Sequence, residues 1–154
     1  MSTSMVNLIR NTLKVLTESN KFDRVLNKVQ IVSASNGRLT AEMEVTEESL
    51  NWSDSLHGGM TATLVDQLSS LALTTALVKE EDLKTETNFA KVKSVSLDLS
   101  ISYLNGVKKG ETLLIEAKTL KFGKTIAFLC VDIFNKQTNQ LVVTGKHTKY
   151  LLKN

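Results

Sequence analysis

One stretch of the sequence places a histidine and two glycines shortly before an isolated acid. Asp66 is the single carboxylate between residues 56 and 78, where there is no Lys or Arg, and His57, Gly58 and Gly59 open this stretch. If a helix begins at the glycines, its first amide groups lack partners within the helix and can hold a developing oxyanion. A buried carboxylate two turns later must find hydrogen bonds or shift its pKa upward, and both outcomes suit a general base or a nucleophile. The alternative is a structural carboxylate that bridges two subunits, beside glycines that only form a turn.

A helix that is apolar on nearly all sides is predicted to carry this acid, from about residue 58 to 78. The residues at helical spacing within it are Leu64, Leu68, Leu71 and Thr75. Because further apolar residues widen this stripe, the helix should be buried. An amphipathic surface helix is predicted at about residues 5–17. That segment can also be read as a mitochondrial presequence, since it contains Arg10 and Lys14 and has no acid before residue 18.

Alternating apolar and polar residues predict six strands. They are residues 28–35, 38–45, 94–104, 111–121, 124–134 and 141–151. The dipeptide Asn36-Gly37 between the first two is a strong signal for a hairpin turn. In the third strand, alternation over the whole length puts Ser96 and Asp98 on a polar face, opposite Leu97 and Leu99.

The order of these elements predicts an α+β fold. Strands joined by tight turns pair antiparallel, and a helix that is apolar on most sides needs cover on most sides. A curved antiparallel sheet wrapped around the long helix meets both demands. Residues 79–93 are charged and weakly periodic, so we expect a surface loop or a short irregular helical extension there. We expect a single domain over residues 1–154, and the open edges of its sheet favour pairing with a second copy.

Composition and charge limit the classes of partner. The chain has 42% hydrophobic and 23% charged residues, as soluble globular proteins do, and its net charge of +3 is too small to indicate nucleic-acid binding. No apolar stretch is long enough to span a bilayer. The single cysteine, Cys130, favours a reducing intracellular compartment, either cytosol or mitochondrion. Cys130 is interpreted as a core residue without a basic partner, and His147 as structural; no cluster of Cys, His and acids has metal-ligand spacing.

The segment LHGGMTATLVDQLSSLAL resembles the central helix of the hotdog-fold acyl-CoA thioesterases. The segments SVSLDLSISYL, LKFGKTIAF, VDIFNKQTNQL and GKHTKYL follow in the family's order, so the resemblance covers nearly the whole chain. It implies a hotdog fold, in which a curved antiparallel sheet wraps a long helix. It also implies dimers whose sheets join, paired into a homotetramer. The implied reaction is hydrolysis of medium- to long-chain fatty acyl-CoA in fatty acid metabolism, without metal or cofactor, since CoA is part of the substrate.

The resemblance also assigns roles to single positions. Asn51 matches an asparagine that helps to hold the thioester carbonyl, and Gly58 matches the glycine whose backbone N–H polarises it. His57 matches the histidine that shapes this turn. Asp66 matches the acid that activates or directs the attacking water, and Ser96 matches the serine that helps to orient that water. In the family, the Asp66 and Ser96 positions act across the dimer interface from the Asn51 and Gly58 positions.

The resemblance further implies a set of CoA-binding positions. They are Ser96, Tyr103, Leu104, Asn105, Gly106, Val107, Lys108, Lys121, Phe122, Gly123, Lys124, Thr125, Ile126 and Tyr150. The chain departs from the family in three places: residues 77–93 form a longer segment, Tyr150 replaces a histidine of a close relative, and LNGVKKG replaces a proline-containing turn. Substrate access, chain-length preference and CoA affinity are therefore not fixed by the resemblance.

Two other activities fit a hotdog fold. A non-catalytic acyl-CoA-binding protein would bind CoA tightly without hydrolysis, but it would not need all five catalytic positions. A hydratase would use His57 with Asp66 as an acid–base pair. Hydration of an enoyl-CoA would distinguish this activity from thioester hydrolysis.

Overall fold

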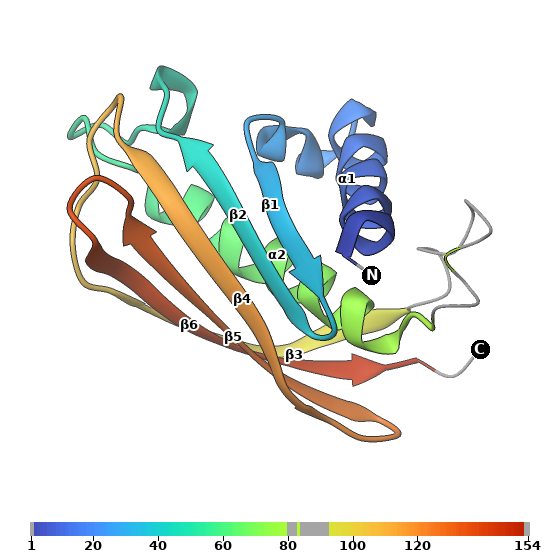
Figure 1. Cartoon of the computed structure of the whole chain (residues 1–154). Coiled ribbons are helices and arrows are strands. Elements are labelled where there is room, and N and C mark those ends of the chain that lie inside the picture. Colours follow the sequence, from blue (N-terminus) through green and yellow to red (C-terminus); the bar gives the residue numbers. More distant parts are fainter. Residues whose placement is uncertain (1, 80–82, 84–92, 153–154) are drawn as a thin grey trace.

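The computed structural model describes residues 2–79, 83 and 93–152, and builds them around one curved sheet (Figure 1). The elements are α1 (Ser2–Glu18), η1 (Phe22–Leu26), β1 (Gln30–Ser35), β2 (Arg38–Glu44), η2 (Glu47–Ser49), α2 (Gly58–Leu77), β3 (Ser94–Tyr103), β4 (Thr112–Phe122), β5 (Ile126–Asn135) and β6 (Gln140–Leu151). The strands pair antiparallel in the order β1-β2-β4-β5-β6-β3, and α2 crosses one side of the sheet. The predicted α+β fold, a long helix wrapped by a curved antiparallel sheet, is confirmed.

The predicted helices and strands have observed counterparts with shifted ends, whereas the short helices η1 and η2 were not predicted. Helices expected at about residues 5–17 and 58–78 are observed as α1 and α2, and each of the six predicted strands has a counterpart. Most of the predicted loop at 79–93 lies outside the described residues. Within the described part of the chain, no helix combines the length and the apolar character needed to cross a membrane.

Helix α2 is buried because its apolar side chains face the sheet. Leu64, Val65 and Leu68 are fully buried, and the helix contacts β2, β4, β5 and β6. It lies closest to β6 at Gly145, where an added Cβ would lie 2.6 Å from Cγ1 of Val65. Only glycine allows this approach, which brings the residues of β6 next to those on α2.

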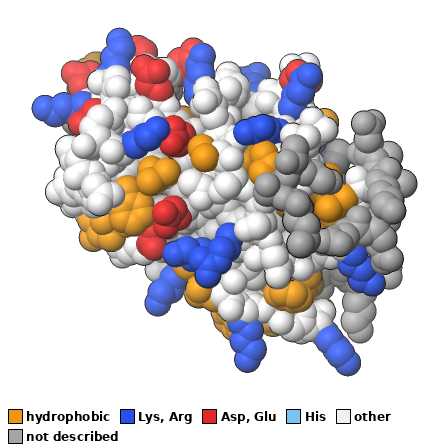
Figure 2. Space-filling model, in the orientation of Figure 1, with side chains coloured by type: hydrophobic (Ala, Val, Ile, Leu, Met, Phe, Trp, Pro, Cys, Tyr) orange, Lys and Arg blue, Asp and Glu red, His pale blue; other side chains and the backbone are white. Residues whose placement is uncertain are grey.

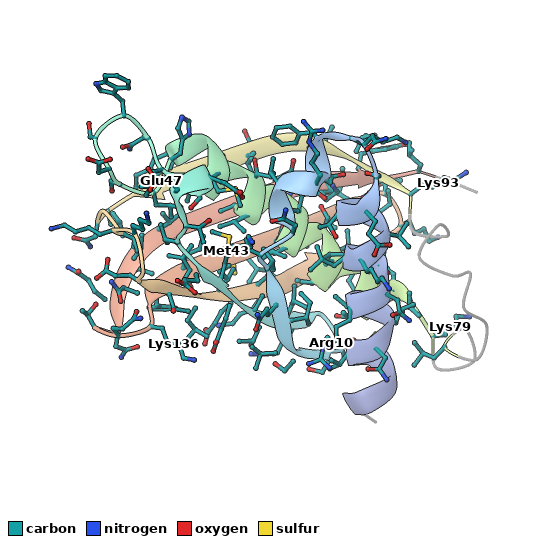
Figure 3. All side chains as sticks on the ribbon, turned by 90° about the horizontal axis from the view of Figure 1, so that it is seen from above. Arg10, Met43, Glu47, Lys79, Lys93 and Lys136 are labelled. Atoms are coloured by element: carbon teal, nitrogen blue, oxygen red, sulfur yellow. The ribbon has the colours of Figure 1, made fainter. Side chains whose placement is uncertain are left out.

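Helix α1 covers the outer edge strand β1. Ile9 and Leu13 are buried on its inner side, in the same apolar cluster as Ile31 of β1. The pairing of β1 with β2 is irregular between Ile31 and Ser33, and the Arg10 guanidinium donates to the Ile31 carbonyl oxygen at 2.9 Å there. Figure 3 shows Arg10 at the α1 side and Met43 in the interior of the molecule. The β1 edge is therefore covered by the chain itself.

Strand β3 forms the other edge of the sheet and, among the described strands, pairs only with β6. A bulge at Leu97 interrupts this pairing, since Ser96 lies opposite Lys149 and Asp98 lies opposite Thr148. The prediction of strict alternation along this strand is therefore wrong. Directly opposite residues of an antiparallel pair share a face, so the bulge puts Ser96 on the helix-facing side with Leu99.

The opposite face of the sheet is largely polar. Charged side chains of both signs are spread over the view in Figure 2, with apolar side chains exposed between them. Cys130 of β5 is half-buried on this face. It lies directly opposite Lys118 of β4 on one side and Lys146 of β6 on the other. The sequence-based interpretation of Cys130 as a core residue without a basic partner is therefore wrong. Burial nevertheless raises the pKa of its thiol, helped by Asp132, while the two lysines lower it.

Candidate active site

The first turn of α2 presents amide groups that the helix does not use. His57 is the N-cap, and its Nδ1 accepts a hydrogen bond from the Gly59 N–H at 2.8 Å. A Cβ on Gly59 would lie 3.0 Å from that Nδ1, so the cap favours glycine. The first helical bond runs from the Thr61 N–H to the His57 carbonyl oxygen. Among the described residues, the N–H groups of Gly58 and Met60 have no partner and are available to an oxyanion.

Asn51 lies in the loop before this turn and shapes it through its side chain. Its Oδ1 accepts from the N–H groups of Ser53 at 2.9 Å and Ser55 at 3.2 Å. This arrangement fixes the amide oxygen toward the loop, and the amide Nδ2 has no partner within the described residues. Asn51 is therefore able to donate a second hydrogen bond to a ligand near Gly58.

A hollow of about 380 Å³ joins these two groups to the end of β3. It is lined by Asn51, Leu56, Gly58, Thr61, Tyr103, Leu104, Asn105, Gly106, Val107, Val142 and Val143. The Tyr103 hydroxyl donates to the Gly58 carbonyl oxygen at 3.2 Å, and Lys108 forms an isolated bridge with Ser55. The structure thus brings together Asn51, Gly58 and the predicted CoA-binding segment 103–108.

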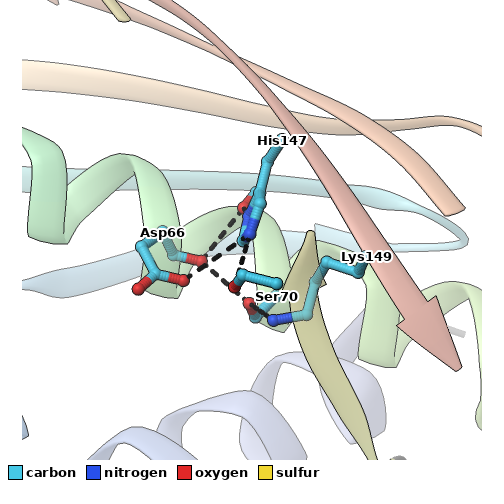
Figure 4. A network of polar contacts seen from close by, with 6 residues as sticks. Asp66, Ser70, His147 and Lys149 are labelled. Atoms are coloured by element: carbon cyan, nitrogen blue, oxygen red, sulfur yellow. Dashed lines mark hydrogen bonds and ion pairs between the residues drawn. The ribbon is translucent and has the colours of Figure 1, made fainter. Parts of the chain in front are cut away.

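Asp66 lies at a second place, in a polar network between α2, β3 and β6 (Figure 4). Its Oδ1 is 3.8 Å from Nε2 of His147, and that nitrogen is 2.8 Å from the Ser96 Oγ. The other ring nitrogen, Nδ1, is 2.7 Å from the Ser69 Oγ. The structure therefore joins the predicted residues Asp66 and Ser96 through a histidine that sequence reasoning had treated as structural.

Exposure differs sharply among these groups. The sequence led us to expect a buried carboxylate at Asp66, but its side chain is 37% exposed. His147 is only 1% exposed. Burial lowers the pKa of His147 to about 4, with a smaller contribution from the charge of Lys149, while Asp66 and Asp98 oppose this shift. The imidazole is therefore neutral at pH 7.

A buried lysine completes the network. Lys149 is 6% exposed, and its Nζ donates to the Ser70 Oγ at 2.9 Å. Burial lowers its pKa, and the nearby Asp66 carboxylate opposes that effect. Gly145, His147 and Lys149 are spaced two residues apart and share the inner side of β6. Such a polar run on a buried strand face is the signal from which the sequence could have indicated this network.

The remaining predicted CoA-binding residues gather at the far end of the sheet. Residues 121–126 form the turn between β4 and β5, which is closed by a bond from the Gly123 N–H to the Ile126 carbonyl oxygen. Ile126 lies opposite Tyr150 on β6, and Tyr150 lies opposite Val95 on β3. This turn and Tyr150 therefore lie at the Ser96 end of β3, away from the segment 103–108 at its other end.

A second hollow lies on the other side of the His57 turn and was not predicted. Its volume is about 360 Å³. Its apolar lining residues are Phe22, Val25, Met43, Leu50 and Met60. His57, Gly59 and Thr63 also line it, so the first turn of α2 separates it from the hollow at Asn51 and Tyr103. Within the described residues, no three His, Cys, Asp or Glu side chains group as metal ligands would.

Comparison with known proteins agrees with this geometry. The profile of the family described as Thioesterase superfamily matches residues 54–142. The human protein acyl-coenzyme A thioesterase 13 is 44% identical over 149 residues, which cover 97% of this chain and 98% of that protein. The crystal structure of zebrafish thioesterase superfamily member 2 superposes with a TM-score of 0.84 at 40% identity, over 96% of this chain and 98% of the other. A hypothetical thioesterase from Streptococcus pneumoniae, solved with coenzyme A, is 25% identical with a TM-score of 0.70, over 83% of this chain and 88% of the other.

Proposed function

Since the chain belongs to the thioesterase superfamily, whose members hydrolyse thioesters, we propose that it hydrolyses fatty acyl-CoA to a fatty acid and CoA. The observation that carries the proposal is the hollow beside α2, which is lined by Gly58, whose N–H has no partner among the described residues, and by most of the predicted CoA-binding segment 103–108. The full-length similarity to human acyl-coenzyme A thioesterase 13 supports the same substrate class.

In the proposed reaction, the thioester carbonyl is held by the first turn of α2. The Gly58 N–H and the Asn51 amide donate to the carbonyl oxygen, which becomes an oxyanion when the carbon is attacked. Donors fixed before the reaction stabilise this charge without reorganising. Loss of one such donor typically lowers kcat by about 10²- to 10³-fold. Asn51 and Gly58 would therefore account for a large part of the rate.

Asp66 and Ser96 act on the water in this proposal. Water forms the new C–O bond as its proton passes to the Asp66 carboxylate. The tetrahedral intermediate then breaks the C–S bond, and the departing CoA thiolate takes the proton from Asp66. No metal or cofactor is required, because CoA is part of the substrate. If Asp66 attacked as a nucleophile instead, a mixed anhydride would form and hydroxylamine would trap it.

The two groups of residues cannot meet on one substrate within a single chain. Gly58 and Asp66 are eight residues apart on α2, about 12 Å along its axis. Tyr103 and Ser96 are seven residues apart on β3, about 23 Å. A carbonyl within hydrogen-bond reach of Gly58 is therefore beyond the reach of a water held by Asp66 of the same chain.

We infer that two chains pair through β3 to complete each site. The free edge of β3 is long, carries Asp98 as its single charged residue between 94 and 103, and exposes apolar side chains. Such an edge favours pairing with another strand. Antiparallel pairing centred near residues 99 and 100 would set Ser96 of one chain opposite Tyr103 of the partner subunit, and the dimers would pair into the tetramer that the family resemblance implies.

The same pairing would join the two parts of the CoA site. The segment 103–108 of one chain would approach the turn 121–126 and Tyr150 of the other. Lys108, Lys121 and Lys124 are exposed and could neutralise the CoA phosphates. Tyr150 presents an aromatic ring where a flat group can pack. An intracellular site of action, cytosolic or mitochondrial, is the location that a CoA ester substrate favours.

The acyl chain is assigned to the apolar hollow on the other side of the His57 turn. A carbonyl at Gly58 would direct its acyl carbons toward Met60, Met43 and Leu50 and its sulfur toward Tyr103. Apolar side chains favour burial of a hydrocarbon chain in proportion to the area removed from water. This supports medium- to long-chain substrates.

The test is release of free thiol from a series of saturated acyl-CoA substrates from C2 to C18, with an enoyl-CoA and an aromatic acyl-CoA added. We expect hydrolysis that increases in kcat/KM from short to medium or long chains. Absence of thiol release from every substrate, with CoA binding still measured by calorimetry, would support the non-catalytic binding protein instead. Hydration of the enoyl-CoA without thiol release would support the hydratase.

A further inference from the structure

His147 occupies the centre of the polar network and has no role in the reaction described so far. It is almost fully buried, and both ring nitrogens have hydroxyl partners: Ser69 on α2 at 2.7 Å and Ser96 on β3 at 2.8 Å. A histidine with two short polar contacts is held in one ring orientation. The direction of each hydrogen bond then depends on which nitrogen carries the proton.

The hydrogen-bond partners of Ser69 indicate the tautomer. Ser69 is fully buried, and its Oγ lies 3.0 Å from the carbonyl oxygen of Asp66, to which it donates. A hydroxyl has one hydrogen, so the Ser69 oxygen accepts from His147 Nδ1–H. A neutral imidazole has one N–H, and its Nε2 is therefore an acceptor. The hydrogen of the Ser96 hydroxyl then points to Nε2.

We propose that His147 is a positioning residue that holds the Ser96 hydroxyl hydrogen, so that Ser96 offers only lone pairs to the attacking water. The proposal rests on the thioesterase function proposed above. A water bound between Asp66 and Ser96 would then donate one hydrogen to the carboxylate and the other to the Ser96 oxygen. One of the two lone pairs of the water oxygen is then directed at the thioester carbon, as attack requires.

The surroundings of His147 keep its ring neutral. The charged groups that influence its pKa are Lys149 from its own strand, Asp66 from α2 and, from the other face of the sheet, Asp98 of β3. Burial and the Lys149 charge disfavour the imidazolium, and the two carboxylates do not outweigh them. A protonated ring would donate from both nitrogens, and the Ser96 hydroxyl would turn its hydrogen toward the water. Such a water would be oriented wrongly for attack.

A double-mutant cycle tests whether His147 acts through Ser96. The variants are Ser69→Ala, Ser96→Ala and the double variant, with kcat and KM measured for an acyl-CoA that the wild type hydrolyses. Ser69→Ala removes one hydroxyl and keeps the helix packed. We expect kcat to fall about 2- to 10-fold, the range that one lost hydrogen bond gives, with KM unchanged. In the Ser96→Ala background, Ser69→Ala should cause no further decrease in kcat.

Ser70→Ala is the matched control. Ser70 is the next residue on α2 and also bonds the Asp66 carbonyl oxygen, but its other partner is Lys149 and not His147. Its effect on kcat should be the same with and without Ser96. Replacement of His147 itself gives a second measurement: His147→Gln keeps an acceptor for the Ser96 hydroxyl and should retain more kcat than His147→Leu. If Ser69→Ala lowered kcat equally in both backgrounds, the proposal would be overturned.

A second readout does not depend on activity. The chain has two histidines, His57 and His147, so ¹⁵N-histidine NMR resolves them and Ser69→Ala identifies His147 by its shift. We expect the Nδ1–H tautomer for His147 at pH 7, and the Nε2–H tautomer would overturn the inference. A wild-type protein that hydrolysed no acyl-CoA would contradict the proposed function, whereas an Nε2–H tautomer in an active enzyme would contradict this inference alone.

Discussion

Two inactive variants should restore activity when they share a dimer. Asn51→Ala removes a carbonyl donor from one half of the site, and Asp66→Ala removes the water-activating acid from the other half. Because Gly58 and Asp66 lie about 12 Å apart along α2, each site should take one half from each chain. In a mixed dimer, one site then carries both substitutions and the other carries neither.

The size of the effect follows from counting sites. Random pairing of equal amounts makes about half of the dimers mixed, and one of the two sites in each is intact, so about one quarter of all sites should work. The chains are refolded together or co-expressed with two affinity tags, and thiol release is measured on the doubly purified mixed dimer. That species should have about half of the wild-type kcat.

The control is the mixture of wild type with the double variant Asn51→Ala/Asp66→Ala. Its mixed dimers have no intact site if each site draws on both chains, but one intact site if each chain forms a complete site. A mixture of the two single variants that stays as inactive as its components, in confirmed mixed dimers, would refute the shared-site reasoning.

Three further results are expected. Gly145→Ala should lower the free energy of unfolding by about 1–3 kcal/mol, because its Cβ would lie 2.6 Å from Val65 Cγ1, and Val65→Ala should recover part of this loss in a denaturant titration. The pKa of His147 is lowered to about 4 in the folded protein, whereas it is near 6.5 in the unfolded chain. The contribution of His147 to the free energy of unfolding is therefore fully present above pH 6.5 and is lost as the pH falls toward 4. His147→Gln should make the free energy of unfolding less dependent on pH between 6.5 and 4. Met60→Trp should fill the apolar hollow and lower kcat/KM for long acyl chains by at least about 10-fold while short chains are hydrolysed as before; equal loss for all chain lengths would place the acyl chain elsewhere.

The sequence predicted the layers of this fold because they depend on local periodicity. The helical spacing around Leu64 and Leu68 and the alternation in six segments are properties of neighbours along the chain. The bulge at Leu97 cannot be read from neighbours along the chain, because it depends on how β3 pairs with β6. Its consequence is large, since it moves Ser96 to the side of the sheet that faces α2.

For the candidate site, the sequence supplied the residues that the family resemblance names. It did not reveal the contacts that arise from the order of the strands in the sheet. His147 and Ser96 are 51 residues apart, and only the placement of β3 beside β6 brings them within 2.8 Å. The lysines beside Cys130 also come from neighbouring strands. The exposure of Asp66, 37% of its side chain, also depends on tertiary packing that local periodicity does not show.

The most direct test of the account is thiol release by Asp66→Asn beside the wild type. This substitution keeps the size of the side chain and removes its charge and basicity. We expect kcat to fall by about 10²-fold or more, with circular dichroism, thermal unfolding and CoA binding unchanged. A folded Asp66→Asn protein that binds CoA and hydrolyses acyl-CoA at a rate close to the wild type would contradict the assignment of Asp66 as the group that activates water.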